Sequence, residues 1–323
     1  MAGKLMVGGQ AVIEGVMMRG PGYMATAVRD PQGRIQVDKQ TVHSIQDRFP
    51  ILKKPMLRGT VALVESLVIG MRSLSYSAKM AGDEDEQLSD KEMALTIVFA
   101  LVLASVLFIA IPTGAAHLFS SVTDDPMWLN FMEGILRLVI FLGYIWGISR
   151  MPDIRRVFQY HGAEHKTIHC YEAGLPLTVA NVQQFSRLHP RCGTNFLLIV
   201  MLVSIFVFAF LGWPNLWLRI ASRVLLLPVV AGISYEFIRF AGRSKSPMVQ
   251  RAIKPGLALQ YLTTRPPQDD MVEVAIESLK AVLPQEEILP GTENYIQKED
   301  NEGSITEITG TDSQVSGAGV TAE

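Results

Sequence analysis

The sequence has only two cysteines and few charges for its length. Two cysteines in 323 residues cannot cross-link a whole fold, so a disulfide scaffold is excluded. Charged residues make up 19% of the chain, against about 25% in a typical globular protein, whereas hydrophobic residues reach 49%. No dense stripe of lysine and arginine is present, which argues against a dedicated nucleic-acid-binding protein, and no DNA partner is expected. The apolar residues are gathered in blocks, which indicates membrane segments between polar parts.

Two common sequence signals are also missing. The first residues, MAGKLMVGGQAV, lack the apolar core of a cleavable secretory signal, so none is expected. The glycine-rich stretch from Gly9 to Pro21 lacks the Gly-Lys-Ser/Thr ending of a phosphate-binding loop. We therefore expect its glycines to serve turns, and the alternative is that Glu14 within it supplies a metal ligand.

Four apolar runs predict membrane-spanning helices, at residues 93–111, 131–148, 196–212 and 216–238. The first run would extend over about 28 Å as a helix, which is enough to cross the hydrocarbon core. The predicted fold class is therefore an α-helical integral membrane protein with four transmembrane helices, a small cytoplasmic α+β part and a disordered acidic C-terminal tail.

The connections between these runs predict their orientation. Residues 120–130 and 213–217 contain no lysine or arginine, whereas residues 149–194 and 239–254 are rich in both. This positive-inside pattern places the segment 149–194 and both termini in the cytoplasm of a multi-pass protein of the cell membrane. The two cysteines then face a reducing compartment, where they are free thiols or metal ligands.

Outside the apolar runs, composition and turn signals predict smaller units. Residues 23–29 and 34–42 flank the turn Asp30-Pro31-Gln32-Gly33 and predict a β-hairpin. Residues 284–323 hold nine acidic residues and one lysine with no periodic apolar face, which predicts disorder. The expected organisation is a β-rich cytoplasmic segment at 1–60, an interfacial or re-entrant helix with an acidic linker at 61–92, transmembrane helices at 93–148, a cytoplasmic His/Cys-bearing loop with a helix at 149–195, transmembrane helices at 196–238, a cytoplasmic helical segment at 239–283 and the tail at 284–323.

The residues best suited to chemistry are concentrated in one cytoplasmic loop. Four of the six histidines and both cysteines fall between residues 161 and 192. At about 100° per residue, one face of the predicted helix collects three histidines and two glutamates: His161, His165, His169, Glu164 and Glu172. Because this face continues an apolar stripe, its polar groups must find partners, and a metal ion is one such partner.

The spacing His161-x-x-Glu164-His165 is that of the inverted zinc-protease motif. Two imidazoles one turn apart can bind one zinc ion, with the glutamate placed as general base. Cys192 or His189 would complete the ligands, and His169 extends the set, whereas Cys170 points away from this face. The alternatives are a hydrogen-bonded network that joins the loop to the N-terminal sheet, and a surface accident.

A second group of charges lies within the predicted spans. Glu133 and Arg137 are one turn apart near the outer end of the second span, and Arg219 and Arg223 near the outer end of the fourth. Charge inside a membrane is costly and needs a reason. We expect an ion pair that joins the two helices, with the outermost arginine reaching toward the surface; the alternative is a hydrophilic groove for a substrate.

Three motifs carry a resemblance to a known family: GGQAVIEGVMMRGP, YHGAEHKTIHCYE and HPRCGTNF. Across residues 5–283 the sequence resembles the YqhQ-type family of bacterial membrane proteins, domain of unknown function 1385, whose label is "predicted metal-dependent enzyme". The resemblance implies a metal-dependent enzyme without assigning roles to residues. The positions that match the His- and Cys-bearing motifs of the family are His161, Glu164, His165, His169, Cys170, His189 and Cys192.

The leading hypothesis is a multi-pass membrane protein with a cytoplasmic zinc site and hydrolytic activity on an unknown substrate. One alternative is a non-enzymatic factor that assists membrane-protein insertion or associates with the ribosome–translocon machinery, because the cytoplasmic part is positively charged close to the bilayer. Another is a small transporter that uses the charges within the spans. The partners considered are the lipid bilayer, further copies of the chain and the membrane-protein biogenesis machinery.

Overall fold

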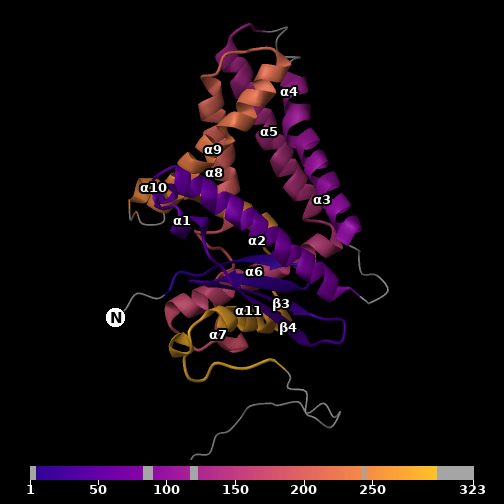
Figure 1. Ribbon diagram of the computed structural model, residues 1–323, viewed down its shortest axis with the longest axis vertical. Helices are drawn as coiled ribbons and strands as arrows, with labels where there is room; N and C mark the ends of the chain where they lie inside the picture. The colour runs from indigo at the N-terminus through magenta and orange to yellow at the C-terminus, as the bar shows by residue number, and fades with distance from the viewer. Residues whose placement is uncertain (1–4, 83–89, 117–122, 242–243, 245, 297–323) are drawn as a thin grey trace, which may run out of the picture.

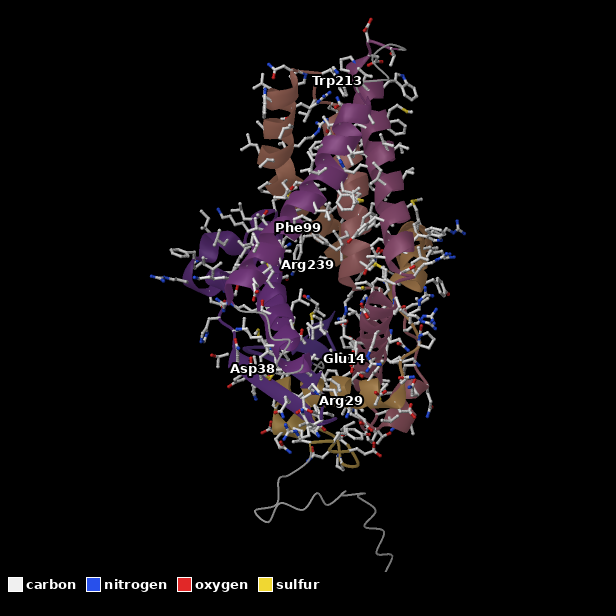
Figure 2. All side chains as sticks on the ribbon, turned by 90° about the vertical axis from the view of Figure 1, so that its right-hand side faces the viewer. Glu14, Arg29, Asp38, Phe99, Trp213 and Arg239 are labelled. Carbon is white, nitrogen blue, oxygen red and sulfur yellow. The ribbon has the colours of Figure 1, made fainter. Side chains whose placement is uncertain are left out.

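The computed structural model describes residues 5–82, 90–116, 123–241, 244 and 246–296, and these form two parts (Figure 1). At one end, a small sheet is packed between helices. At the other end, long apolar helices run away from the sheet. Arg29 lies in the sheet end, and Trp213 lies near the far tip of the long helices (Figure 2).

The strands precede all the long helices along the chain. The sheet consists of β1 (Gly8–Val12), β2 (Gly15–Arg19), β3 (Tyr23–Arg29) and β4 (Ile35–Thr41). The helices that follow are α1 (Ile45–Arg48), η1 (Pro50–Lys53), α2 (Leu57–Ala81), α3 (Asp90–Ser105), η3 (Val106–Ala110, a π-helical stretch), α4 (Ile111–Ala116), α5 (Pro126–Ile148), α6 (Pro152–Ala173), α7 (Val179–Gln183), α8 (Gly193–Ala209), α9 (Leu216–Ala241), α10 (Pro247–Thr263), α11 (Asp269–Val282) and η5 (Gln285–Glu287).

The sheet is an antiparallel meander in the order β1-β2-β3-β4. The predicted hairpin between β3 and β4 is confirmed. Its turn is held by Asp30, whose carboxylate accepts hydrogen bonds from the backbone N–H of Arg34 at 2.8 Å and from the side chain of Gln36. Gly33 closes the turn with φ 84°, a left-handed conformation that glycine adopts without steric cost.

Helices cover both faces of the sheet (Figure 1). Side chains alternate between the two faces along a strand, so each face presents apolar residues to the helices that cover it. On one face, Met17 and Met24 pack with Ile69 of α2. On the other face, Met18 and Ala25 belong to the main core, which α6 and α11 complete. A four-stranded sheet too small to be stable alone is thus buried on both sides.

The apolar runs form helices, and three of these are long and apolar enough to cross a membrane: Ala94–Ala116, Pro126–Ile148 and Trp217–Ala241. The remaining run forms α8, an apolar helix of only 17 residues. Of the four predicted spans, three therefore have the required length and composition among the described residues, and the fourth is present as a shorter apolar helix.

The prediction of disorder from residue 284 onward is wrong for residues 284–296. This segment forms η5 and then lies against α11 and the chain before α7. The hydroxyl of Thr292 accepts a hydrogen bond from the N–H of Leu177 at 3.1 Å, and the N–H of Tyr295 donates to Glu277 at 2.7 Å. Hydrogen bonds between backbone and side-chain groups hold this segment, together with the packing of Ile288 and Tyr295 against the main core. These contacts leave no periodic apolar pattern in the sequence. Residues 297–323 and the predicted acidic linker at 83–89 lie outside the described residues.

Residues 264–268 connect α10 to α11. Gln268 is the N-cap residue of α11, and Asp269 and Asp270 lie in the first turn of this helix. Acidic side chains there still favour the positive end of the helix dipole.

Candidate metal centre

The candidate site lies where the apolar helices meet the sheet end of the molecule. α6 begins four residues after the end of α5, so its histidines follow directly from a long apolar helix. α8 begins at Gly193, immediately after Cys192. α10 passes beside α8 and leads into the 265–267 connection. Three helices thus present side chains or carbonyl groups to one place.

The structure brings His161, His165 and Cys192 together. One ligand atom from each lies within 4.8 Å of the others. Nε2 of His161 is 3.3 Å from the sulfur of Cys192, and the two imidazole rings are 4.4 Å apart between centroids. At these distances, one metal ion placed between the three side chains would reach a ligand atom of each.

The ring nitrogens of these two histidines are oriented by backbone carbonyls. Nδ1 of His161 lies 2.8 Å from the carbonyl oxygen of Thr263, and Nδ1 of His165 lies 2.5 Å from that of Arg187. A carbonyl oxygen can only accept, so both Nδ1 atoms carry the proton and both Nε2 atoms keep a lone pair. Such a second hydrogen bond typically orients a metal-ligating histidine.

Burial favours the neutral form of one of these imidazoles. His165 is buried, and burial lowers its pKa, although its contacts with Cys192 oppose this effect. A histidine must be neutral to bind a metal. Cys192 is also buried, and its sulfur caps α8 by accepting a hydrogen bond from the N–H of Thr194 at 3.4 Å.

Glu164 lies beside this group in a buried position. Its Oε2 is 3.8 Å from Nε2 of His161. Burial raises the pKa of its carboxyl to about 7, while His161 and a hydrogen bond from the N–H of Gly9 oppose the rise. A side chain at Gly9 would place its Cβ 2.9 Å from Cγ of Glu164, so a glycine in β1 allows this close approach.

The other two predicted ligands belong to a second group, formed by His169, Glu172 and His189. Nε2 of His169 donates to the carbonyl of Leu188 at 3.0 Å. His189 accepts a hydrogen bond from the N–H of Arg191 at Nδ1, which leaves its Nε2 to face Glu172 at 3.8 Å. His189 therefore uses both nitrogens within the protein, and this group has the contacts of a hydrogen-bonded network.

Charge pairing accounts for much of that network. The nearby imidazole of His189 lowers the pKa of Glu172, and Arg191 adds to this effect through an ion pair. Burial lowers the pKa of His189. The predicted set of five ligands thus divides between two groups. His161, His165 and Cys192 form one group, and His169 and His189 lie with Glu172 in the other.

Sequence reasoning missed Gln260 of α10, which holds this loop. Its side-chain oxygen accepts from the N–H of His189 and its amide donates to the carbonyl of the same residue, both at 2.8 Å. Gln260 is fully buried, at 0% exposure. A glutamine 71 residues downstream within an apolar helix face carries no local signal of this role.

Two further expectations concern residues outside the cluster. Glu14, the alternative ligand, pairs instead with Arg156 of α6 and accepts from the hydroxyl of Tyr160 at 3.2 Å. It belongs to neither group. Cys170 points into the main core, toward the carbonyls of Leu175 and Pro176, as its position on the helix predicts.

The structure also brings together the charges of α5 and α9. Glu133 pairs with Arg137 at 2.6 Å and with Arg223 at 3.3 Å, in line with the expected ion pair between the two helices. Arg219, the outermost of these arginines, is only 4% exposed and lies over the ring of Trp213, 3.9 Å from its centroid.

Comparison with known proteins gives one curated relative and one family. Residues 54–285 match the model of the family described as "Protein of unknown function (DUF1385)", and this range includes His161, His165, His169, His189 and Cys192. The chain is 40% identical over 292 residues to the uncharacterized protein YqhQ of Bacillus subtilis (strain 168). The aligned region covers 85% of this chain and 92% of that protein. No solved structure matches the chain significantly.

Proposed function

The chain belongs to the DUF1385 family of proteins of unknown function, and on that premise we propose that it is a membrane-embedded, metal-dependent hydrolase. The metal would be zinc, held by His161, His165 and Cys192. The observation that carries this proposal is the meeting of three nitrogen and sulfur ligand atoms within 4.8 Å, with both histidines oriented through Nδ1.

The donor set fits zinc better than the other common metals. Imidazole and thiolate are its usual ligands in proteins, whereas magnesium and calcium prefer oxygen. The three ligands come from α6 and the cap of α8 and are held by hydrogen bonds. His165 and Cys192 are buried and His161 is half-buried. Three protein ligands are the usual number in catalytic zinc sites, which keep one further position for water or substrate.

Glu164 is the residue best placed to act as general base. Its carboxylate lies on the same face of α6 as His161, 3.8 Å from Nε2 of that residue, and the side chain is buried. Bound zinc would supply Lewis acidity at this place. Glu164 would accept a proton from a water molecule, and the N–H of Gly9 would keep its carboxylate oriented.

The proposed location is the inner face of the cell membrane. Support comes from the three helices of membrane-spanning length together with the basic residues of the segments 149–194 and 239–254. In this arrangement the helical stretch Ala94–Ala116, α5, α8 and α9 lie in the bilayer. Both termini face the cytoplasm, and the metal centre lies at the level where α6 leaves the membrane.

Metal analysis of the purified full-length protein tests the proposal. We expect about one zinc per chain in the wild type, and at least tenfold weaker binding in His161→Ala, His165→Ala and Cys192→Ser, since each removes a ligand. Cys170→Ser is the matched control, because that sulfur lies in the core away from the cluster. Equal metal content in all variants would contradict the proposal.

The role of Glu164 is tested separately from metal binding. Glu164→Gln should keep the zinc content and the zinc absorption-edge spectrum of the wild type, because the amide replaces a neighbour and not a ligand. The spectrum should report three protein ligands of nitrogen and sulfur and one oxygen from water. A spectrum that loses an oxygen ligand in Glu164→Gln would make the centre a closed, structural one and contradict a hydrolytic role.

A further inference from the structure

The charged cluster between α5 and α9 holds more positive than negative charge. Three guanidinium groups, those of Arg137, Arg219 and Arg223, surround the single carboxylate of Glu133. Thr113 and Asn130 add only neutral partners, at 3.2 Å from Glu133 and 2.5 Å from Arg223. Among the described residues, the cluster therefore carries two positive charges that no acidic side chain balances.

Two nitrogens in each of two of these arginines have no acceptor, although Nη2 of Arg223 donates to Asn130 and Glu133. Nε and Nη1 of Arg219, and Nε and Nη1 of Arg223, are buried without a hydrogen-bond partner in the part of the chain that the structure describes. The residues are 4% and 6% exposed. Their planar faces are covered by Trp213 and Phe208, at 3.9 Å and 4.4 Å from the ring centroids, so the edges are what remains for a ligand.

Buried N–H groups of a cation are costly to leave without an acceptor, and this cost is greater inside a membrane. The planar fork of a guanidinium matches the oxygens of a phosphate, and two adjacent arginines can bind one phosphate with several charge-assisted hydrogen bonds. The unpaired edges and the excess charge therefore both indicate an anion with phosphate-like oxygens.

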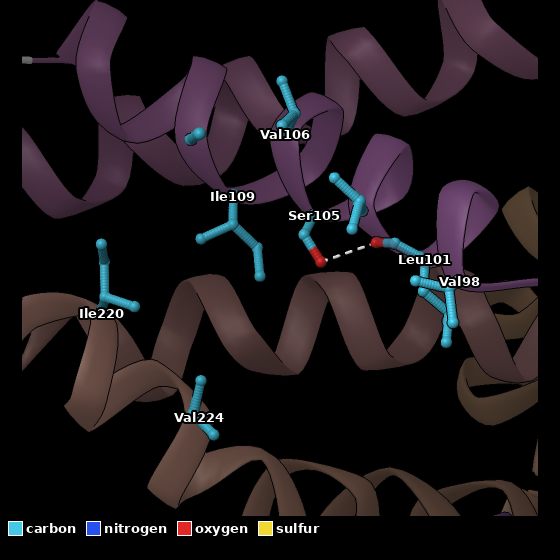
Figure 3. Close-up of a pocket in the computed structure, with 9 residues that line it drawn as sticks. Val98, Leu101, Ser105, Val106, Ile109, Ile220 and Val224 are labelled. Carbon is cyan, nitrogen blue, oxygen red and sulfur yellow. Dashed lines mark hydrogen bonds between the residues drawn. The ribbon is translucent and has the colours of Figure 1, made fainter. Parts of the chain in front are cut away.

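A groove beside the cluster indicates what carries this anion. The groove has a volume of about 520 Å³ and lies between α3 with η3 on one side and α9 on the other (Figure 3). Val98, Ile109, Ile220 and Val224 form its walls, and the hydroxyl of Ser105 is turned to the carbonyl of Leu101 of its own helix. An apolar groove of this kind suits a hydrocarbon chain.

The groove and the arginines adjoin on both walls. On α9, Arg219 and Arg223 immediately precede the groove residues Ile220 and Val224. On the opposite wall, Arg137 donates through Nε to the carbonyl of Phe108, the residue before Ile109. The arginines do not line the groove itself, but Arg219 and Arg223 each lie one position from a residue that does. The head group of a molecule with its chain in the groove would therefore be near their unpaired N–H groups.

We propose that Arg219 and Arg223 bind the phosphate of an anionic membrane lipid whose acyl chain lies in the groove between α3 and α9. The proposal rests on the membrane placement proposed above and is independent of the metal centre. The excess charge selects a lipid with net negative charge, because a zwitterionic head group would bring its own cation into the cluster. Arg137 is already engaged by Glu133 and Phe108, so its role is to position the cluster.

The test uses the full-length protein extracted from washed membranes in mild detergent. Native mass spectrometry should detect one phosphatidylglycerol-like lipid per chain after exchange into lipid-free detergent. Arg219→Gln combined with Arg223→Gln should weaken lipid binding by at least about tenfold, because charge-assisted hydrogen bonds are lost. Val224→Trp, which fills the groove, should lower lipid retention while leaving the arginines in place. Arg239→Gln, at the other end of α9, is the control and should retain the lipid.

The source of the phosphate is decided by a second measurement on lipid-free protein. Phosphatidylglycerol should raise the melting temperature of the wild type but not of Val224→Trp, and phosphatidylcholine or millimolar inorganic phosphate should not raise it. Stabilisation by inorganic phosphate in both proteins would overturn the lipid in favour of a free anion. If the double arginine variant does not fold, the comparison of wild type with Val224→Trp still decides between a lipid and a free anion.

The outcomes separate this site from the proposed function. Protein that sediments with the membranes but carries no anionic lipid, and is not stabilised by it, overturns the lipid site and leaves the membrane placement standing. Protein that remains soluble after lysis overturns both. Lipid retention that is equal in wild type, the folded double arginine variant and Val224→Trp also overturns the site.

Discussion

The side chain of Gln260 holds the main chain of His189 from both sides, with two hydrogen bonds of 2.8 Å across 71 residues of sequence. Gln260 thereby attaches the loop before α8 to α10. The same loop supplies the carbonyl of Arg187 to His165 and the sulfur of Cys192 to the candidate metal centre. The position of the third ligand thus depends on a residue that touches no ligand atom.

Replacing this residue should weaken both the fold and metal binding. In Gln260→Met, the N–H and carbonyl of His189 lose buried partners, which we expect to cost about 1–3 kcal/mol for each group left unpaired. Zinc affinity should fall by about 10-fold or more, as is typical when an outer partner is lost. The measurements are thermal unfolding and zinc titration in detergent. The exposed Gln184→Met is the control, and equal behaviour of the two variants would refute the role of Gln260.

A glycine in α6 allows the chain after α10 to approach the site. A Cβ on Gly162 would lie 2.1 Å from the carbonyl oxygen of Arg265. Gly162→Ala should therefore destabilise the protein by about 1–3 kcal/mol through overpacking. It should also move the nearby carbonyl of Thr263 away from His161, and so weaken zinc binding. Gly143→Ala is the matched control, because nothing lies within 4 Å of its added Cβ. A Gly162→Ala protein as stable as this control would contradict the close approach.

Because of Asp30 in the hairpin turn, we expect the stability of the protein to depend on pH in the acid range. Burial raises the pKa of Asp30, but hydrogen bonds from Gln36 and Arg34 outweigh this effect and hold the pKa below its usual value of 3.8. A lowered pKa in the folded state means that the ionised carboxylate contributes stability above about pH 4, and that this contribution is lost as pH falls through the folded pKa.

Asp30→Asn should remove that contribution. We expect the variant to be about 1 kcal/mol less stable than the wild type at pH 7, and this difference to shrink below pH 4. Melting temperatures of both proteins between pH 7 and pH 3 provide the measurement. Asp38→Asn, on the same hairpin, serves as control. A difference that stays constant over this range would show that the hydrogen bonds do not depend on ionisation.

Two ion pairs at different depths should respond differently to removal of the carboxylate. Glu133→Gln leaves buried arginines without their counter-charge, which we expect to cost about 3–5 kcal/mol. Glu236→Gln breaks the pair with the half-buried Arg58 and should cost about 1 kcal/mol or less. Thermal stability of the two variants in the same detergent compares them. Similar losses would mean that Glu133 is not the balancing charge of the cluster.

Local patterns were enough to predict the secondary structure around the site. The turn residues from Asp30 to Gly33 predict the hairpin because their backbone preferences act within four residues. His161 and His165 share a helix face because of a spacing that depends only on helix geometry. The membrane-length helices follow from apolar runs, and the exception is α8, whose described length is shorter than the run suggests.

Contacts between distant segments could not be predicted in this way. The grouping of His189 with Glu172, rather than with His161, depends on the path of the loop before α8 and on its attachment to Gln260. The docking of residues 284–296 depends on hydrogen bonds with distant residues such as Leu177 and Glu277, and on the packing of Tyr295 against the core. The pairing of Glu14 with Arg156 joins side chains 142 residues apart. None of these relations leaves a periodic trace in the sequence.

The candidate ligands are divided between two helices that both continue into the apolar part of the molecule. His161 and His165 lie on α6, which follows α5, and Cys192 is the cap of α8. A filled centre would therefore cross-link two helical arms and set their separation at the membrane surface. Bilayer thickness changes the tilt of membrane helices. On the proposed membrane placement, a change in thickness would therefore change the affinity of the three side chains for zinc, and zinc binding would in turn favour one tilt.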